Sequence, residues 1–165
     1  MKNFYCLFHL NLQFSSIPIK DFKKIINNVY YPILNIIDKH NYHLSIELTG
    51  WTLEKINEID KNWIKDFKIL LSKKKCTLIG SGYSQIIGPI YDSNINFNNQ
   101  KLGIEVYKKI LNIKPKISLV NEMAFSNGLI EVYKKFYEAI ILDIKNAEIS
   151  KNIKLQNNNF PNLLI

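Results

Sequence analysis

Apolar and polar positions form two kinds of block along this chain. Short, continuously apolar runs are typical of buried parallel strands, and they alternate with longer segments whose apolar residues recur every three or four positions, as in helices. The runs expected to be strands are residues 3–12, 43–49, 76–79, 117–120 and 139–142. The pattern therefore predicts five strand and helix units in the order β then α.

The helical segments between these strands cover residues 19–29, 32–40, 53–59, 61–73, 99–111 and 126–136. Asp60 is expected to cap the helix over 61–73, either Asn98 or Asn99 the next helix, and Ser126 the last. Pro32 fits the first turn of a separate segment. Helical spacing predicts two buried faces, formed by Phe22, Ile25, Ile26 and Val29 in the first helix and by Leu102, Val106 and Ile110 in another.

This alternation predicts an α/β fold with parallel strands and right-handed crossovers. Both a barrel and an open doubly wound sheet fit the element order. The turn over residues 9–16, HLNLQFSS, lacks the glycines that let a pyrophosphate approach a helix N-terminus, so a barrel is favoured. A full barrel typically needs about 250 residues. The chain supplies five strands and stops on the apolar run FPNLLI, so we expect it to be truncated within a strand at its C-terminus.

The amino-acid composition limits the classes of binding partner that the sequence predicts. The net charge of +8 would suit a polyanion, but all 22 basic residues are Lys, and Arg makes the bidentate contacts typical of nucleic-acid binders. We therefore expect no nucleic-acid partner. Cys6 and Cys76 lack metal-site spacing and are expected to be small buried hydrophobes in a reducing compartment. Without a cleavage signal or a run of membrane-spanning length, the sequence predicts a cytoplasmic protein with no membrane partner.

Polar residues stand where the predicted strands end. His9 and Asn11 follow the first strand, Tyr83 and Gln85 lie in the glycine-rich loop GSGYSQIIGPI after the third, and Glu47, Thr49, Glu122 and Asp143 end the second, fourth and fifth. The carboxyl ends of parallel strands meet at one mouth, where α/β enzymes place their sites. We therefore expect these groups to surround one central acid, Glu122.

Several phrases then resemble a known family. The His-containing end of the first strand, LSIELTGWTLEKI, IGSGYSQIIGP and LGIEVYKKILNIKPKISLVNEMAFSNGLIEVYKK look like the N-terminal part of a glycoside hydrolase family 57 protein, the group of α-amylases, α-glucanotransferases and branching enzymes. The resemblance covers nearly the whole chain. It implies that residues 1–165 are the N-terminal portion of a single incomplete (β/α)7-type barrel acting on α-glucans by a retaining mechanism.

The resemblance also assigns roles. A retaining glycosidase needs an ionised nucleophile and a second, protonated carboxyl group. The family's nucleophile matches Glu122, and its acid, an Asp, is expected beyond residue 165. Asp143 is a possible secondary acid that does not match the family's residue. His9, Asn11, Trp51, Tyr83 and Gln85 are expected to bind sugar, although the family usually has His at the positions of Asn11 and Gln85.

Two other functions stay open. A carbohydrate-binding or regulatory barrel without activity is favoured by the two missing His residues. A polysaccharide deacetylase would bind zinc through an Asp and an H-x-x-x-H pair, whereas this chain has only His40 and His43, spaced H-x-x-H and expected far from the mouth. We therefore expect no metal and no cofactor, and an α-glucan or oligosaccharide as the partner. The sequence does not predict the oligomeric state.

Overall fold

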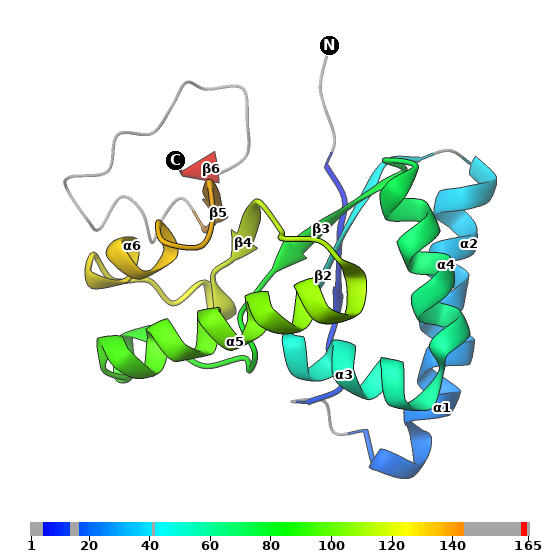
Figure 1. Cartoon of the computed structure of the whole chain (residues 1–165), viewed down its shortest axis with the longest axis horizontal. Coiled ribbons are helices and arrows are strands. Elements are labelled where there is room, and N and C mark those ends of the chain that lie inside the picture. Colours follow the sequence, from blue (N-terminus) through cyan, green and yellow to red (C-terminus); the bar gives the residue numbers. More distant parts are fainter. Residues whose placement is uncertain (1–4, 14–16, 41, 144–162, 165) are drawn as a thin grey trace.

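The computed structural model describes residues 5–13, 17–40, 42–143 and 163–164. Its centre is one sheet whose strands lie side by side in chain order (Figure 1). The first five strands pair in parallel, and they are β1 (Leu7–Leu10), β2 (Leu44–Leu48), β3 (Cys76–Gly80), β4 (Ile117–Leu119) and β5 (Ala139–Ile141). This order, with helical connections between successive strands, confirms the α/β fold and the parallel sheet predicted from the sequence.

The apolar run at the end of the chain also contributes a strand. β6 (Leu163–Leu164) pairs with β5, but in the antiparallel direction, unlike the other strands. Residues 160–162 and 165 of that run, and residues 3 and 4 of the predicted first strand, lie outside the described residues.

Ten helical segments connect the described strands. They are η1 (Ile19–Asp21), α1 (Phe22–Ile25), η2 (Ile26–Tyr30), α2 (Tyr31–His40), α3 (Gly50–Ile59), α4 (Lys61–Ser72), η3 (Gly88–Ile90), α5 (Ser93–Leu111), η4 (Asn121–Met123) and α6 (Gly128–Tyr133). Figure 1 shows α2 and α4 side by side on one flank of the sheet, with α5 running along another.

A π-helical turn joins α1 to α2, so the two predicted segments form one continuous helical stretch. Pro32 follows this turn and has no amide hydrogen to donate, which favours the wider turn before it. The turn shifts the buried face by one residue. Tyr30 is therefore buried, with 4% of its surface exposed, whereas Val29 is 43% exposed, so the expectation for Val29 was wrong.

Helix α5 starts earlier than predicted. Asp92 caps it by accepting hydrogen bonds from the backbone nitrogens of Asn94 (2.8 Å) and Ile95 (2.9 Å), so the caps expected at Asn98 or Asn99 were wrong. The Asn99 side chain instead binds the glycine-rich loop. Val106 and Ile110 are buried as predicted, but Leu102 is 46% exposed.

The last helix is shorter than predicted. α6 begins at Gly128 and ends at Tyr133, and the residue before it, Asn127, makes no side-chain cap bond. Ser126 contributes its backbone carbonyl, which accepts from the nitrogen of Leu129 at 3.0 Å, so its predicted role as a side-chain cap was wrong. Asp60 does cap α4, as predicted, at 3.0 and 3.1 Å from the nitrogens of Asn62 and Trp63.

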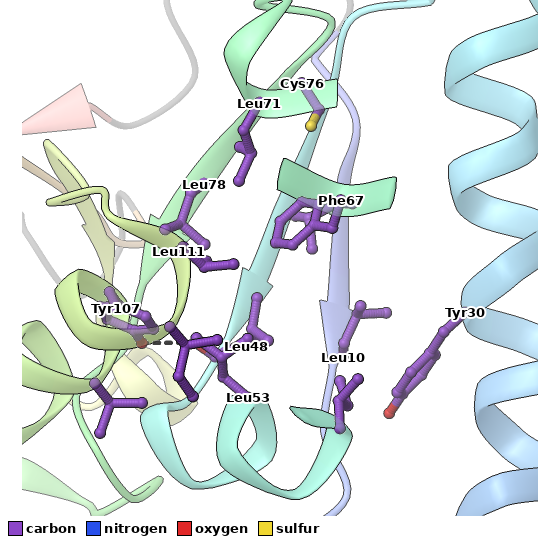
Figure 2. Close-up of a cluster of buried hydrophobic side chains, with 14 of the residues drawn as sticks. Leu10, Tyr30, Leu48, Leu53, Phe67, Leu71, Cys76, Leu78, Tyr107 and Leu111 are labelled. Atoms are coloured by element: carbon purple, nitrogen blue, oxygen red, sulfur yellow. Dashed lines mark hydrogen bonds between the residues drawn. The ribbon is translucent and has the colours of Figure 1, made fainter. Parts of the chain in front are cut away.

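The helices pack on one face of the sheet to form the core. Leu10, Leu48 and Leu78 project from this face and are buried among side chains of the helices. Figure 2 shows two of these helical side chains, Leu53 and Phe67. Trp63 on α4 is fully buried, as expected for a core residue. Cys76 is buried too. Cys6 is exposed, contrary to expectation, because it precedes β1, which among the described strands pairs with β2 alone.

Alternate residues of these strands point to the opposite face. His9 of β1 is the register partner of Glu47 of β2, and Glu47 is in turn the partner of Ile79. Partners in neighbouring strands project to the same side of a sheet. His9 and Glu47 therefore share the face that the core leucines do not occupy.

No helix in the described part of the chain is long and apolar enough to cross a bilayer.

Candidate active site

The centre of the candidate site is a pair formed by His9 and Glu47. The Nδ1 atom of His9 is hydrogen-bonded to Oε2 of Glu47. The Glu47 carboxylate is fully buried, whereas 39% of the His9 side chain is exposed. The hydrogen bond to Glu47 raises the pKa of His9 above its usual 6.5, burial opposes the rise, and the negative charges of Glu47 and Glu122 add to it. The pair therefore favours a positively charged imidazole.

Two amide side chains extend this pair. Nε2 of Gln85 lies 3.2 Å from Nε2 of His9, and Nδ2 of Asn11 donates to Oε1 of Gln85 at 2.5 Å. The backbone nitrogen of Gln13 donates to Oδ1 of Asn11 at 2.9 Å. The structure thus brings together His9, Asn11 and Gln85, which the sequence predicted to share one site.

The glycine-rich loop that carries Gln85 is fixed from several sides. Gly82 has a φ of 78°, which suits glycine, and it lies against Gly103 of α5 so closely that a Cβ at position 103 would come within 2.5 Å of its carbonyl carbon. Asn99 of α5 accepts from the Ser84 nitrogen at 2.8 Å and donates to the Ser84 carbonyl at 2.9 Å. Gln85 is therefore presented from a rigid support.

Glu122 lies in the short turn η4 directly after β4, and its side chain is exposed. Its backbone is left-handed, with φ 53° and ψ 17°, and Met123 also has a φ of 53°. Such conformations cost about 1 kcal/mol or more in residues with a Cβ, and they concentrate at functional sites. The buried Asn121 steadies the turn by donating to the carbonyl of Ser81 at 3.2 Å. Glu122 thus follows β4 at the edge of the sheet where His9 lies near the end of β1, and its negative charge raises the pKa of His9.

The two aromatic candidates pack around α3. The hydroxyl of Tyr83 donates to Oε2 of Glu54 at 3.0 Å, and its ring lies against Gly50. Trp51 is half-buried and meets Phe22 edge-on, with 6.3 Å between ring centroids. Asp143 is exposed and follows β5 by two residues. The sugar-binding roles of Trp51 and Tyr83 and the acid role of Asp143 stay predictions.

The two other histidines lie away from this mouth. His43 precedes β2 and contacts the carbonyl of Lys74 at 3.2 Å and Oγ1 of Thr77 at 2.8 Å, while His40 stacks on Tyr42. Among the residues that the structure describes, no group of three or more His, Cys, Asp or Glu side chains could hold a metal ion.

Glu47 is the site residue to which sequence reasoning assigned no role. It was expected only as one polar group at a strand end, yet it is a fully buried acid inside a strand. The signal was a charged residue between apolar neighbours in LSIEL, because a buried charge requires a partner.

The chain is similar to known proteins in both sequence and fold. The model of the family described as "Glycosyl hydrolase family 57" matches residues 1–161. A protein of Methanocaldococcus jannaschii named "Putative alpha-amylase" is 24% identical over 118 residues, which are 68% of this chain and 25% of that protein. The chain thus spans about a quarter of this curated relative.

Solved structures show the same fold. A 4-alpha-glucanotransferase from Thermococcus litoralis superposes with a TM-score of 0.73 at 15% identity, over 85% of this chain and 22% of the other. The alpha-amylase AmyC from Thermotoga maritima superposes with a TM-score of 0.71 at 14% identity, over 84% of this chain and 39% of the other. A CE4 family pseudoenzyme from Bacillus anthracis superposes with a lower TM-score of 0.60 at 14% identity, over 86% of this chain and 43% of the other.

Proposed function

Because the chain belongs to glycosyl hydrolase family 57, we propose that its protein is a glycoside hydrolase or transglycosidase that cleaves α-glucans with retention of configuration. The observation that carries this proposal is the position of Glu122: an exposed carboxylate at the carboxyl end of β4, in the same mouth as His9 and Glu47. The α-glucan substrate is supported by the names of the amylase and glucanotransferase relatives.

In the proposed reaction, the ionised Glu122 attacks the anomeric carbon and forms a covalent glycosyl intermediate, while a protonated carboxyl group gives its proton to the leaving oxygen. Water, or a hydroxyl group of another glucan, then releases the sugar. We assign the acid to an Asp outside residues 1–165, with Asp143 as the secondary candidate. His9, Asn11 and Gln85 would hydrogen-bond sugar hydroxyls, and Trp51 and Tyr83 would offer aromatic faces.

A second function is a carbohydrate-binding barrel without activity. Asn11 and Gln85 favour it, because amides bind hydroxyl groups but carry neither a proton for transfer nor a charge. The CE4 likeness, at lower TM-scores, supports the barrel fold alone. We also propose a cytoplasmic location, which the two free cysteines support.

The test is Glu122→Gln in the complete protein that contains this chain. The amide is nearly isosteric but a poor nucleophile, so cleavage or transfer of maltoheptaose should fall by at least about 10³-fold while the circular dichroism spectrum is unchanged. Glu131→Gln, an exposed change on α6, is the matched control and should keep full turnover. Unchanged turnover in Glu122→Gln would remove Glu122 as the nucleophile. Maltoheptaose binding without turnover by the wild type would favour the inactive barrel.

A further inference from the structure

Glu47 is a buried acid for which the proposed reaction has no use. Its side chain is fully buried, one oxygen is bonded to His9, and the other, Oε1, finds no donor among the described residues. Burying an ionised carboxylate costs several kcal/mol unless a partner charge and hydrogen bonds compensate. His9 is the charge partner that the structure provides, so the two groups depend on each other.

The hydrogen bonds around His9 have a consistent direction. Asn11 donates to Gln85, Nε2 of Gln85 meets Nε2 of His9, and Nδ1 of His9 faces Glu47. When His9 is neutral, this arrangement places its proton on Nδ1 and leaves Nε2 to accept from Gln85. Glu47 therefore determines which ring nitrogen faces the mouth.

We propose that Glu47 is a positioning residue: its buried carboxylate holds the His9 ring by Nδ1, so that Nε2 faces Gln85 and the sugar that the mouth receives. Its effect on sugar binding rests on the proposed function, whereas its hold on His9 does not. A neutral side chain of the same shape would pack equally well at this position. A substitution that removes only the charge of Glu47 therefore tests the positioning role separately from packing.

Charged and titratable groups of several described elements act on the pair. Glu47 and Glu122 act on His9. The negative charge of Glu47 also acts on Tyr30, Tyr107 and Tyr137, whose phenols remain protonated at neutral pH because burial raises their pKa values. The ring of His9 therefore responds mainly to Glu47.

Proton and nitrogen NMR of the three histidines tests the proposal directly in this chain. In the wild type, His9 should titrate above the usual imidazole range and carry its proton on Nδ1 when neutral. In Glu47→Gln, which keeps the shape but not the charge, the titration midpoint of His9 should fall. His40 and His43 serve as internal references, because unchanged signals from them show that the fold persists. Glu58→Gln, an exposed change on α3, is the matched control and should leave His9 unaltered.

Maltoheptaose titration then measures the consequence for the site. Glu47→Gln should weaken binding by about fivefold, the effect of one hydrogen bond. An unchanged midpoint of His9 in Glu47→Gln would overturn the proposal whatever the activity. A lowered midpoint with wild-type affinity would overturn the role in sugar binding. If the wild type binds no maltoheptaose but the midpoint falls, the hold of Glu47 on His9 stands and the proposed substrate fails.

Discussion

The hydroxyl of Tyr107 on α5 donates a hydrogen bond of 2.6 Å to the carbonyl oxygen of Leu48, the last residue of β2 (Figure 2). The same hydroxyl accepts from the backbone nitrogen of Ser81 at 3.2 Å. One buried phenol thus satisfies a backbone carbonyl at the end of β2, which carries Glu47, and a backbone nitrogen directly after β3, whose following loop carries Gln85. It fixes the carboxyl ends of these strands relative to each other.

Tyr107→Phe should therefore destabilise the protein. The ring would still fill its space, but the buried carbonyl of Leu48 would lose this donor, which typically costs about 1–3 kcal/mol. Urea unfolding measures the loss, with Tyr42→Phe as the control, because Tyr42 is exposed. Equal stability of the two variants would show that the phenol is not needed to satisfy these groups.

The start of α5 gives a prediction that distinguishes the helix cap seen in the structure from the cap expected from the sequence. Asp92→Ala removes the side chain that accepts from two backbone nitrogens at the first turn, and should lower the free energy of unfolding by about 1 kcal/mol. Asn98→Ala alters an exposed position inside the helix and should change stability little. Thermal unfolding of both variants decides the matter. A larger loss in Asn98→Ala would place the helix start where the sequence pattern put it.

Stability should depend on pH through His9. Its pKa is raised in the folded protein, chiefly by the hydrogen bond to Glu47, so protonation favours folding. The stabilisation is complete below the unfolded value of about 6.5 and is lost as the pH rises through the folded pKa. The stability of the wild type relative to Glu47→Gln should therefore be greater at about pH 6 than at about pH 9. Guanidinium unfolding at both values measures it, and a constant difference would contradict a charged pair.

Sequence periodicity was sufficient for the parallel strands, because each of them reads as a largely apolar run. It also placed His9, Asn11 and Gln85 together, since groups at the carboxyl ends of the parallel strands lie along one edge of the sheet. Helix details depended on tertiary structure instead. Val29 satisfies the helical period, but the π turn rotates it outward, and nothing in a 3.6-residue pattern announces that turn.

Two other features, the start of α5 and the role of Glu47, had weaker signals in the sequence. Asp92 is followed by an exposed isoleucine and several asparagines, so the first turns of α5 carry little amphipathic pattern and the start of the helix was misplaced. Glu47 looked like one more polar residue at a strand end. Its burial became visible only when the register paired it with His9.

The close contact between Gly82 and Gly103 limits how this protein can change. Glycine inside a helix costs about 1 kcal/mol relative to alanine, so α5 is weaker at this point than a generic helix would be. A side chain at position 103 would push on the backbone of the loop that carries Gln85, and would displace the amide from His9. Substitutions that strengthen the helix would thus alter the site, and these two glycines can be replaced only together with a new path for the loop.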